Sequence, residues 1–178
     1  MARIEPVDPN GASPTQRASL AAIVGRVTNM KRTLAHSRVA LDALMQWYPL
    51  QEAVMPFLGA RATSLFCRAI SAQNSCLICS SYFRRELVES GEDPDNLHLS
   101  ELERVVVDFG YQLARDPHAV DDDLYTGLAT HFSDEQIVTL TAFGALMIAT
   151  NVFNDALRVD LDADLEPFRA EPSEVRIG

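Results

Sequence analysis

The chain has 178 residues, of which 47% are hydrophobic and 22% are charged. This length supports one domain with a real core, and this composition excludes a disordered or fibrous protein. Residues 1–90 carry ten Lys or Arg against six acids, whereas residues 91–178 carry five against nineteen, giving a net charge of −10. An acidic surface without a basic stripe repels phosphate backbones, so we expect no nucleic-acid partner.

The first thirty residues lack the basic flank, apolar run and small-residue cleavage site of a signal peptide. The longest apolar stretch, 137–153, is shorter than a bilayer requires and contains several Thr residues and Asn151. We therefore expect a cytoplasmic protein without membrane association. In a reducing compartment, three cysteines favour catalysis or sensing over a structural disulfide framework.

Every periodic segment follows the helical period, and no alternating β-branched run of useful length occurs. Ser13, Ser100 and Ser133 each begin a capping-box pattern. In the first part of the chain, helices are predicted over about 13–27 and 37–47, followed by a short helix or turn between Pro49 and Pro56 that ends at Gly59. A further helix is predicted over about 61–73, and the next begins at the following cysteines and ends near Ser90. The last three predicted helices run from Ser100 to Pro117, begin at Asp121–Asp123, and begin after Ser133.

The final helix is apolar almost all round, which predicts a position at the centre of the fold or at a subunit interface. The prediction is an all-α single domain over residues 1–178. Residues 1–13 are expected to be a flexible N-terminal segment, and residues 161–178 an acidic C-terminal tail that frays.

Two cysteines, Cys76 and Cys79, stand at the start of the predicted helix that ends near Ser90. Thiols three residues apart on a helix share one face and lie close enough to bridge. The helix dipole favours a thiolate at the N-terminus, and most strongly at Cys76. A redox pair is therefore the leading hypothesis.

The segment RATSLFCRAISAQNSCLICSSYFRRELVESG, from Arg61 to Gly91, resembles the core of the carboxymuconolactone decarboxylase and alkylhydroperoxidase D (AhpD-like) superfamily. The stretch from Phe132 to Val159, with its NVFN sequence, is similar as well. The resemblance implies an all-helical bundle that assembles into dimers, trimers or hexamers. It also implies reduction of peroxides at Cys76 and Cys79 by a dithiol protein reductant.

Redox-active members of the superfamily carry a Glu twelve residues before the first cysteine and a His four residues after the second. Here these positions hold Ser64 and Phe83. The apolar side chain of Phe83 is expected to exclude water from the site and thereby raise the pKa of a cysteine thiol. We hypothesise that Arg61 and Arg68, which flank Ser64 on one helix face, lower a cysteine pKa instead; the alternative is that both are solvated surface residues.

Other polar residues have alternative interpretations. Tyr82 and Glu86 share a helix face with Cys79 and could supply a hydrogen bond or a base, although packing and surface roles are the ordinary expectation. Cys67 is expected to be a buried small hydrophobe. One histidine could fold back towards Cys79 and replace the missing base; the candidates are His36, His98, His118 and His131.

Asn151 and Asn154 interrupt the final apolar helix and are expected to be structural, bonded to backbone or to a neighbouring subunit. Nucleotide, flavin and zinc motifs are absent from the sequence, so we expect no cofactor and no metal.

Three functions remain open at this point. The first is a thiol-dependent oxidoreductase that reduces a hydroperoxide or relays electrons through Cys76 and Cys79. The second is a non-catalytic helical scaffold or redox sensor that has lost the proton relay. The third is a decarboxylase acting on a muconolactone-type substrate, which the cysteine pair does not support.

Overall fold

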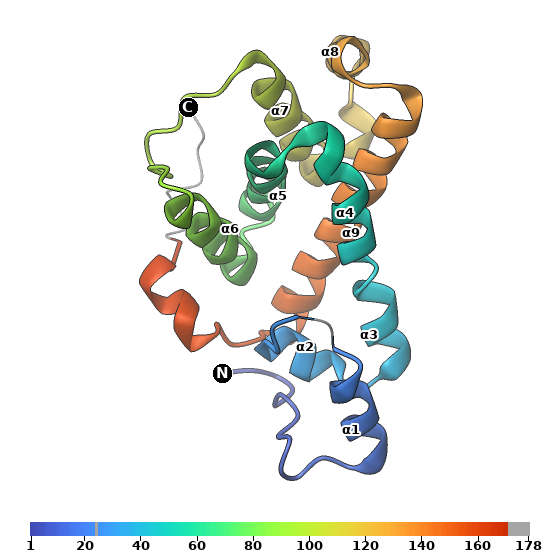
Figure 1. The fold of residues 1–178 in the computed structure, drawn as a ribbon, viewed down its shortest axis with the longest axis vertical. Helices are drawn as coiled ribbons and strands as arrows, with labels where there is room; N and C mark the ends of the chain where they lie inside the picture. Colours follow the sequence, from blue (N-terminus) through green and yellow to red (C-terminus); the bar gives the residue numbers. More distant parts are fainter. Residues whose placement is uncertain (24, 171–178) are drawn as a thin grey trace.

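The computed structural model describes residues 1–23 and 25–170, and within these ranges it contains nine α-helices, two 3-10 helices and no strand. The all-α prediction is confirmed, and Figure 1 shows the arrangement. The elements are α1 (Pro14–Ala21), α2 (Asn29–Leu34), α3 (Arg38–Leu44), α4 (Trp47–Leu58), α5 (Ala60–Gln73), α6 (Leu77–Glu89), α7 (Glu101–Arg115), η1 (Pro117–Ala119), α8 (Asp122–His131), α9 (Asp134–Leu157) and η2 (Ala163–Phe168).

The three predicted capping boxes are all present. The side chains of Ser13, Ser100 and Ser133 each accept a hydrogen bond from the backbone three residues on, and the Gln or Glu there bonds back to the serine N–H. Each serine thus satisfies backbone donors that the first helical turn leaves free. These local signals fixed the starts of α1, α7 and α9 correctly.

Some of the other boundaries differ from the prediction. α1 ends at Ala21 rather than near 27, and α2 was not predicted. α4 is continuous from Trp47 to Leu58, where the two prolines had suggested a shorter element. Pro49 lies in the first turn, where its missing N–H needs no partner, and Pro56 lies in the last turn, so the helix loses little.

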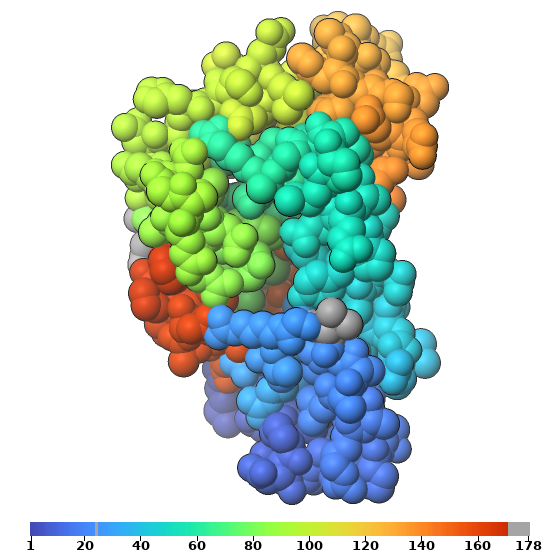
Figure 2. Space-filling view, in the orientation of Figure 1, coloured from blue at the N-terminus to red at the C-terminus, as the bar shows by residue number. Residues whose placement is uncertain are grey.

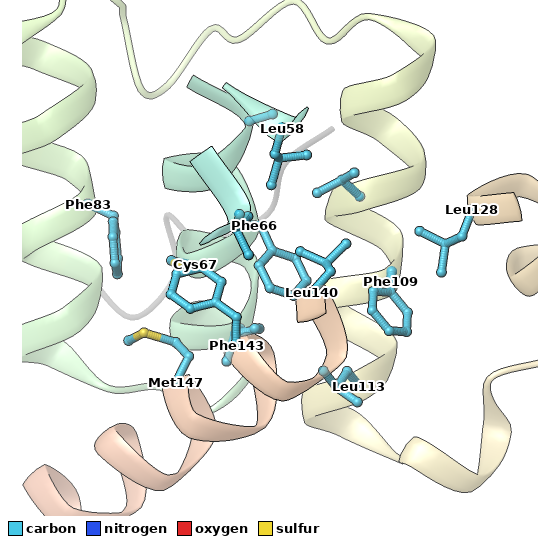
Figure 3. Packing of buried hydrophobic residues seen from close by; sticks show 14 of the residues in the cluster. Leu58, Phe66, Cys67, Phe83, Phe109, Leu113, Leu128, Leu140, Phe143 and Met147 are labelled. Carbon is cyan, nitrogen blue, oxygen red and sulfur yellow. The ribbon is translucent and has the colours of Figure 1, made fainter. Parts of the chain in front are cut away.

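The core is built around α5, which packs against α4, α6, α7 and α9. At its centre the ring of Phe66 stacks on Phe109 at 6.1 Å and on Phe143 at 6.2 Å between centroids. Figure 3 shows Phe66 between the helices that carry these two rings, with Phe83 and Met147 next to each other at the α6 side of the cluster. This packing holds α7 and α9 against α5.

Within the described residues, α9 is the one helix long and apolar enough to cross a membrane by length and composition. It runs along α4 and also packs against α5, α7 and α8 (Figure 1). Its inward face carries large buried side chains, including Leu140, Phe143 and Met147. These contacts account for its apolar character as that of a core helix, as predicted.

The N-terminal segment is tied to the body of the protein, in contrast to the expectation of a flexible extension over 1–13. Val7 is buried, and its backbone exchanges hydrogen bonds with Arg32 at 2.8 and 3.3 Å. The N–H of Arg3 donates to the carbonyl of Leu157 at 2.9 Å. Local sequence patterns do not indicate these contacts, because the partner residues lie far along the chain.

The described part of the C-terminal tail also packs onto the molecule. η2 lies against α6, with Leu165 buried, and the N–H of Ala170 donates to Ser81 Oγ at 3.1 Å. The expectation of a fraying tail is therefore wrong for residues 161–170. Residues 171–178 lie outside the described residues.

Candidate functional site

A tight corner between α5 and α6 positions the cysteine pair. The N–H of Ser75 donates to Ala72 O and the N–H of Cys76 donates to Ser71 O, both at 2.9 Å. This pattern is a Schellman motif, which closes α5 by turning one residue into the left-handed region. That residue is Ser75, with φ of 58° rather than the usual glycine. Cys76 follows directly as the N-cap of α6, so no flexible linker separates the pair from the core.

Both cysteines of the pair are buried free thiols, with Cys76 0% and Cys79 6% exposed. The two thiols are near each other without forming a disulfide, and interaction with Cys76 shifts the pKa of Cys79. Cys76 was expected to gain most from the helix N-terminus. Its side chain, however, makes no capping hydrogen bond to α6.

The two sulfurs have different surroundings, because Cys79 lines a pocket and Cys76 does not. The pocket has a volume of about 110 Å³ and a mostly apolar wall. It lies between α6 and α4, where Figure 2 shows the surface hollowed between the light-green and teal helices. The side chains lining it include Met30, Lys31, Met45, Trp47, Tyr48, Ile78, Tyr82, Phe83, Met147 and Asn154. The sequence had favoured Cys76, but a small molecule in this pocket meets Cys79.

Asn154 on α9 contacts the cysteine pair directly. Its Nδ2 donates a hydrogen bond to Cys79 Sγ at 3.4 Å, and the side chain is 2% exposed. Within the chain the partner of Nδ2 is thus a sulfur atom and not the expected backbone group. Asn151, one turn earlier, is also buried, and neither polar atom of its side chain has a hydrogen-bond partner within the described residues.

The pKa of the Cys79 thiol is raised well above its ordinary value. The hydrogen bond with Cys76 is the largest cause, and burial is the second. The bond from Asn154 acts in the opposite direction, because it stabilises the thiolate, while the charge of Asp155 raises the pKa slightly further. The Cys79 thiol is therefore mostly protonated at neutral pH.

Asp155 is a site residue that the sequence analysis missed. The residue is exposed to solvent. Partial desolvation raises the pKa of its carboxyl group, and interaction with Cys76 lowers that pKa in part. The available signal was its place directly after Asn154 in the NVFND segment, on the part of α9 that meets the pair.

The arginine hypothesis is wrong, and so is its alternative of two solvated side chains. Arg61 is paired with Glu92 at 2.7 Å and with Glu103, and these two bonds raise its pKa. Arg68 is 5% exposed, and its charge helps to lower the pKa of Asp95. Neither guanidinium is among the groups that shift the pKa of Cys79.

Of the remaining candidate residues, Phe83 and Tyr82 line the pocket, whereas Cys67 and Ser64 do not. Phe83 is buried in the pocket wall, which fits the expectation of a dry site. Tyr82 also lines the pocket, and burial, together with Glu86, raises its pKa to about 12. The Cys67 thiol is fully buried, as expected, and burial raises its pKa. Ser64 is a partly buried residue of α5 and does not line the pocket.

None of the four histidines lines the pocket beside Cys79. His36 bonds to Gln16 and to the carbonyl of Glu5, both in the N-terminal part of the chain. His131 packs against Phe132 at the end of α8, and His98 and His118 are exposed. A histidine replacement for the missing base is thus absent from the pocket wall. Across residues 1–23 and 25–170, no group of three or more His, Cys, Asp or Glu side chains is arranged to hold a metal ion.

The sequence matches no known family model and no curated protein. Solved structures, in contrast, superpose over most of the chain. A protein from Ralstonia eutropha, described as an alkylhydroperoxidase AhpD core and an uncharacterized peroxidase-related protein, has a TM-score of 0.72 and 19% identity, covering 92% of this chain and 94% of that one. The chain has an AhpD-like fold.

Two further structures share this AhpD-like fold. The debrominase Bmp8 has a TM-score of 0.71 and 17% identity over 97% of both chains. A cysteine-to-alanine variant of Bmp8 was solved in complex with 2,3,4-tribromopyrrole. An Agrobacterium tumefaciens protein of unknown function, described as a putative antioxidant defence protein AhpD, has a TM-score of 0.63 and 21% identity over 73% of this chain and 95% of that one. At these sequence identities the similarity establishes the fold alone, and the activities named for these structural neighbours differ from one another.

Proposed function

We propose that the protein is a thiol oxidoreductase in which Cys76 and Cys79 cycle between dithiol and disulfide to reduce a small molecule in the pocket. The observation that carries this proposal is the asymmetry of the pair. Cys79 lines the pocket, whereas the nearby Cys76 is completely buried and does not line it. One sulfur is therefore placed to meet a substrate and the other to close a disulfide.

With a hydroperoxide as substrate, the Cys79 sulfur attacks the terminal peroxide oxygen. The O–O bond breaks, an alcohol leaves with the thiol proton, and Cys79 becomes a sulfenic acid. The Cys76 sulfur then attacks the Cys79 sulfur, forming the S–S bond and releasing water. A protein dithiol restores both thiols by exchange and becomes a disulfide itself. The peroxide is reduced by two electrons, which come from that dithiol.

The pocket supports a second candidate substrate, an apolar halogenated ring. The wall is mainly aromatic and aliphatic, and its volume of about 110 Å³ is that of a small ring rather than a long chain. The likeness to a debrominase adds support to this alternative. In that reaction a thiolate takes the halogen from carbon, the ring carbon takes a proton, and the second thiol displaces halide as the disulfide forms. Decarboxylation has no comparable support, because none of these structural neighbours is described as a decarboxylase.

A coupled assay tests the proposal. Cumene hydroperoxide and 2,3,4-tribromopyrrole are each offered with excess dithiothreitol, and consumption by the wild type is compared with Cys76→Ser and Cys79→Ser. We expect turnover of at least one substrate, lost in both variants and retained in the control Cys67→Ser, whose sulfur is buried away from the pocket. Consumption no faster than with free dithiothreitol would favour the non-catalytic scaffold.

We also propose that the protein acts as a homo-oligomer in the cytoplasm. Support for assembly comes from the outer face of α9, where Val138 and Val152 are 68% and 59% exposed and four exposed alanines continue the same stripe, namely Ala142, Ala145, Ala149 and Ala156. Apolar side chains at this spacing form a seam that a second copy of the same helix can cover. The three unpaired cysteines are consistent with a reducing compartment.

A further inference from the structure

The wall of the candidate substrate pocket is built from two kinds of structure. The helices α4, α6 and α9 supply side chains that also belong to the central core cluster, such as Phe83 and Met147. The stretch after α9, residues 159–170, which we call the strap, supplies Asp162 and Leu165. Its helical part is the short 3-10 helix η2, in which Leu165 is the one buried residue. The core therefore holds the strap less firmly than it holds the helices.

Hydrogen bonds attach the strap to α2 on one side and to α6 on the other. The backbone N–H of Asn29 donates to Asp162 Oδ1 at 2.9 Å, and its side-chain Nδ2 donates to the carbonyl of Asp160 at 3.1 Å. At the far end, the N–H of Ala170 donates to Ser81 Oγ on α6 at 3.1 Å. Figure 1 shows the strap, in red, leaving the end of α9 beside α2 and continuing to α6. The strap thus closes the side of the pocket between α2 and α6.

The carboxylate of Asp164 joins the two sides. Its Oδ2 oxygen is paired with Arg26, in the stretch before α2, and accepts a hydrogen bond from Nη1 of Arg85 on α6 at 2.8 Å. The guanidinium of Arg85 also lies over the ring of Tyr82, 4.9 Å from its centroid, and Tyr82 lines the pocket. Two guanidinium groups that share one oxygen would repel each other without the carboxylate. Asp164 therefore fixes the place of the next residue, Leu165.

The position of Leu165 decides how much room is left beside Cys79. Both residues line the same pocket of about 110 Å³, a volume that suits a single small ring. In an apolar pocket, a change the size of one methylene group is enough to discriminate between substrates. On the basis of the function proposed above, we infer that Leu165 is a specificity-determining residue that limits the size of the molecule reaching Cys79. Asp164 is the positioning residue that holds Leu165 in the wall.

Alkylation of Cys79 by two reagents measures this size limit without any turnover. Iodoacetamide and N-benzyl iodoacetamide carry the same reactive carbon, and each forms a thioether bond to the sulfur while iodide leaves. The ratio of the two rates therefore cancels the reactivity of the thiol itself. Mass spectrometry of digested protein follows Cys79, and the same digests report Cys67, which is 0% exposed and reacts only when the core opens.

The variants separate the size of the wall from the contact that holds it. Leu165→Ala shortens the wall residue, Asp164→Asn removes the shared charge, and Asp164→Glu keeps that charge. The matched control is Glu166→Gln, which removes a surface ion pair with Arg169 at 2.9 Å from the same 3-10 helix and does not touch the pocket wall.

We expect Leu165→Ala to raise the ratio of the benzyl to the parent reagent by about tenfold, the low end of discrimination by a methylene-sized change. Asp164→Asn should raise it by about fivefold, which corresponds to an ion pair of about 1 kcal/mol. Asp164→Glu and Glu166→Gln should stay within about twofold of wild type. Raising NaCl from about 0.1 M to about 1 M should move the wild-type ratio towards that of Asp164→Asn, because salt screens the half-exposed pair with Arg26.

Labelling of Cys67 should stay at the wild-type rate in every variant. If neither Leu165→Ala nor Asp164→Asn changes the ratio, or if the ratio rises only together with Cys67 labelling, the size limit is overturned. A rise in Leu165→Ala alone overturns the role of Asp164, and a rise in Asp164→Asn alone overturns that of Leu165.

The coupled assay decides the proposed function separately. Absence of turnover there, combined with the expected labelling ratios, would disprove the oxidoreductase and leave the size limit in place. With turnover, Leu165→Ala should raise kcat/KM for cumene hydroperoxide relative to hydrogen peroxide, and Glu166→Gln should not.

Discussion

Asn154 and Asn151 share one face of α9, and both are buried, yet their surroundings differ. Asn154 Nδ2 bonds to the Cys79 sulfur at 3.4 Å, whereas both side-chain polar atoms of Asn151 lack a partner within the described residues. A hydrogen bond to a sulfur stabilises its thiolate, and an unpaired buried amide costs free energy of folding. The same residue type therefore has opposite consequences three positions apart.

Replacing Asn154 by Leu should weaken the reactivity of Cys79. Loss of a hydrogen bond of about 1 kcal/mol raises the thiol pKa by about 0.7 unit, so oxidation by hydrogen peroxide at pH 7 should slow by about fivefold. Because the pKa of Cys79 is already raised, the wild-type rate should still climb between about pH 8 and 10. Stopped-flow measurement across this range checks both statements, and a wild-type rate that levels off by pH 8 would contradict the second.

The matched change Asn151→Leu should leave Cys79 reactivity unaltered and stabilise the fold. Removing two unpaired buried polar atoms is expected to raise the free energy of unfolding by about 1 kcal/mol, as read from urea denaturation. A loss of stability instead would mean that the amide is bonded in the assembled protein.

At the scale of elements, the contact of α9 with α5 and α7 depends on a glycine. A Cβ added at Gly144 would lie 2.6 Å from Leu113 Cδ2 and 2.8 Å from Phe66 Cζ, both in the core. Because α9 carries Asn154 and Asp155, its distance from the core sets their distance from the sulfurs of α6. The site is thus sensitive to packing that lies well away from the pocket.

Gly144→Ala should destabilise the protein by about 1–3 kcal/mol, since overpacking outweighs the gain of about 1 kcal/mol in helix propensity. Gly127→Ala in α8 is the control, because its Cβ would meet only Val105 at 3.5 Å, an ordinary contact. This second variant should be neutral or slightly more stable. Urea denaturation of the two proteins measures the difference, and equal stabilities would mean that α9 can shift without cost.

The same reasoning explains why the arginines of α5 do not serve the cysteines. Arg61 is held by Glu92 in the α6–α7 loop and by Glu103 of α7, which is the N3 residue of the α7 capping box. The two ion pairs of Arg61 therefore hold the α6–α7 loop and the start of α7 against α5. Spacing along α5 placed Arg61 on the expected face, but the acids on neighbouring elements determined its partners.

For the molecule as a whole, the exposed apolar face of α9 is the feature that bears on assembly. Val152→Glu places a charge in the stripe and should reduce the mass in solution to that of the 19.6 kDa monomer. Val39→Glu on α3, where the side chain is 80% exposed, is the control and should leave the oligomer intact. Light scattering after size-exclusion chromatography measures both, and a wild-type protein already at 19.6 kDa would rule out the proposed assembly.

The sequence by itself determined the helices and the chemistry available at the cysteine pair. The capping boxes at Ser13, Ser100 and Ser133 and the helical period act over three or four residues, so they can be recognised without knowing the fold. The spacing of Cys76 and Cys79 belongs to the same local range. α2 and the continuous α4 were missed because the first is short and the second tolerates its prolines near its ends.

Only the tertiary structure decided which sulfur meets the pocket and what surrounds it. Asn154 lies 75 residues from Cys79 along the chain, and the pocket beside Cys79 is lined by side chains from α2, α4, α6 and α9. Contacts of this range depend on how α9 packs against α5 and where the α5–α6 corner directs each thiol. The physical reason is that local sequence specifies the backbone of each helix, whereas pairing between helices is selected by the packing of the whole core.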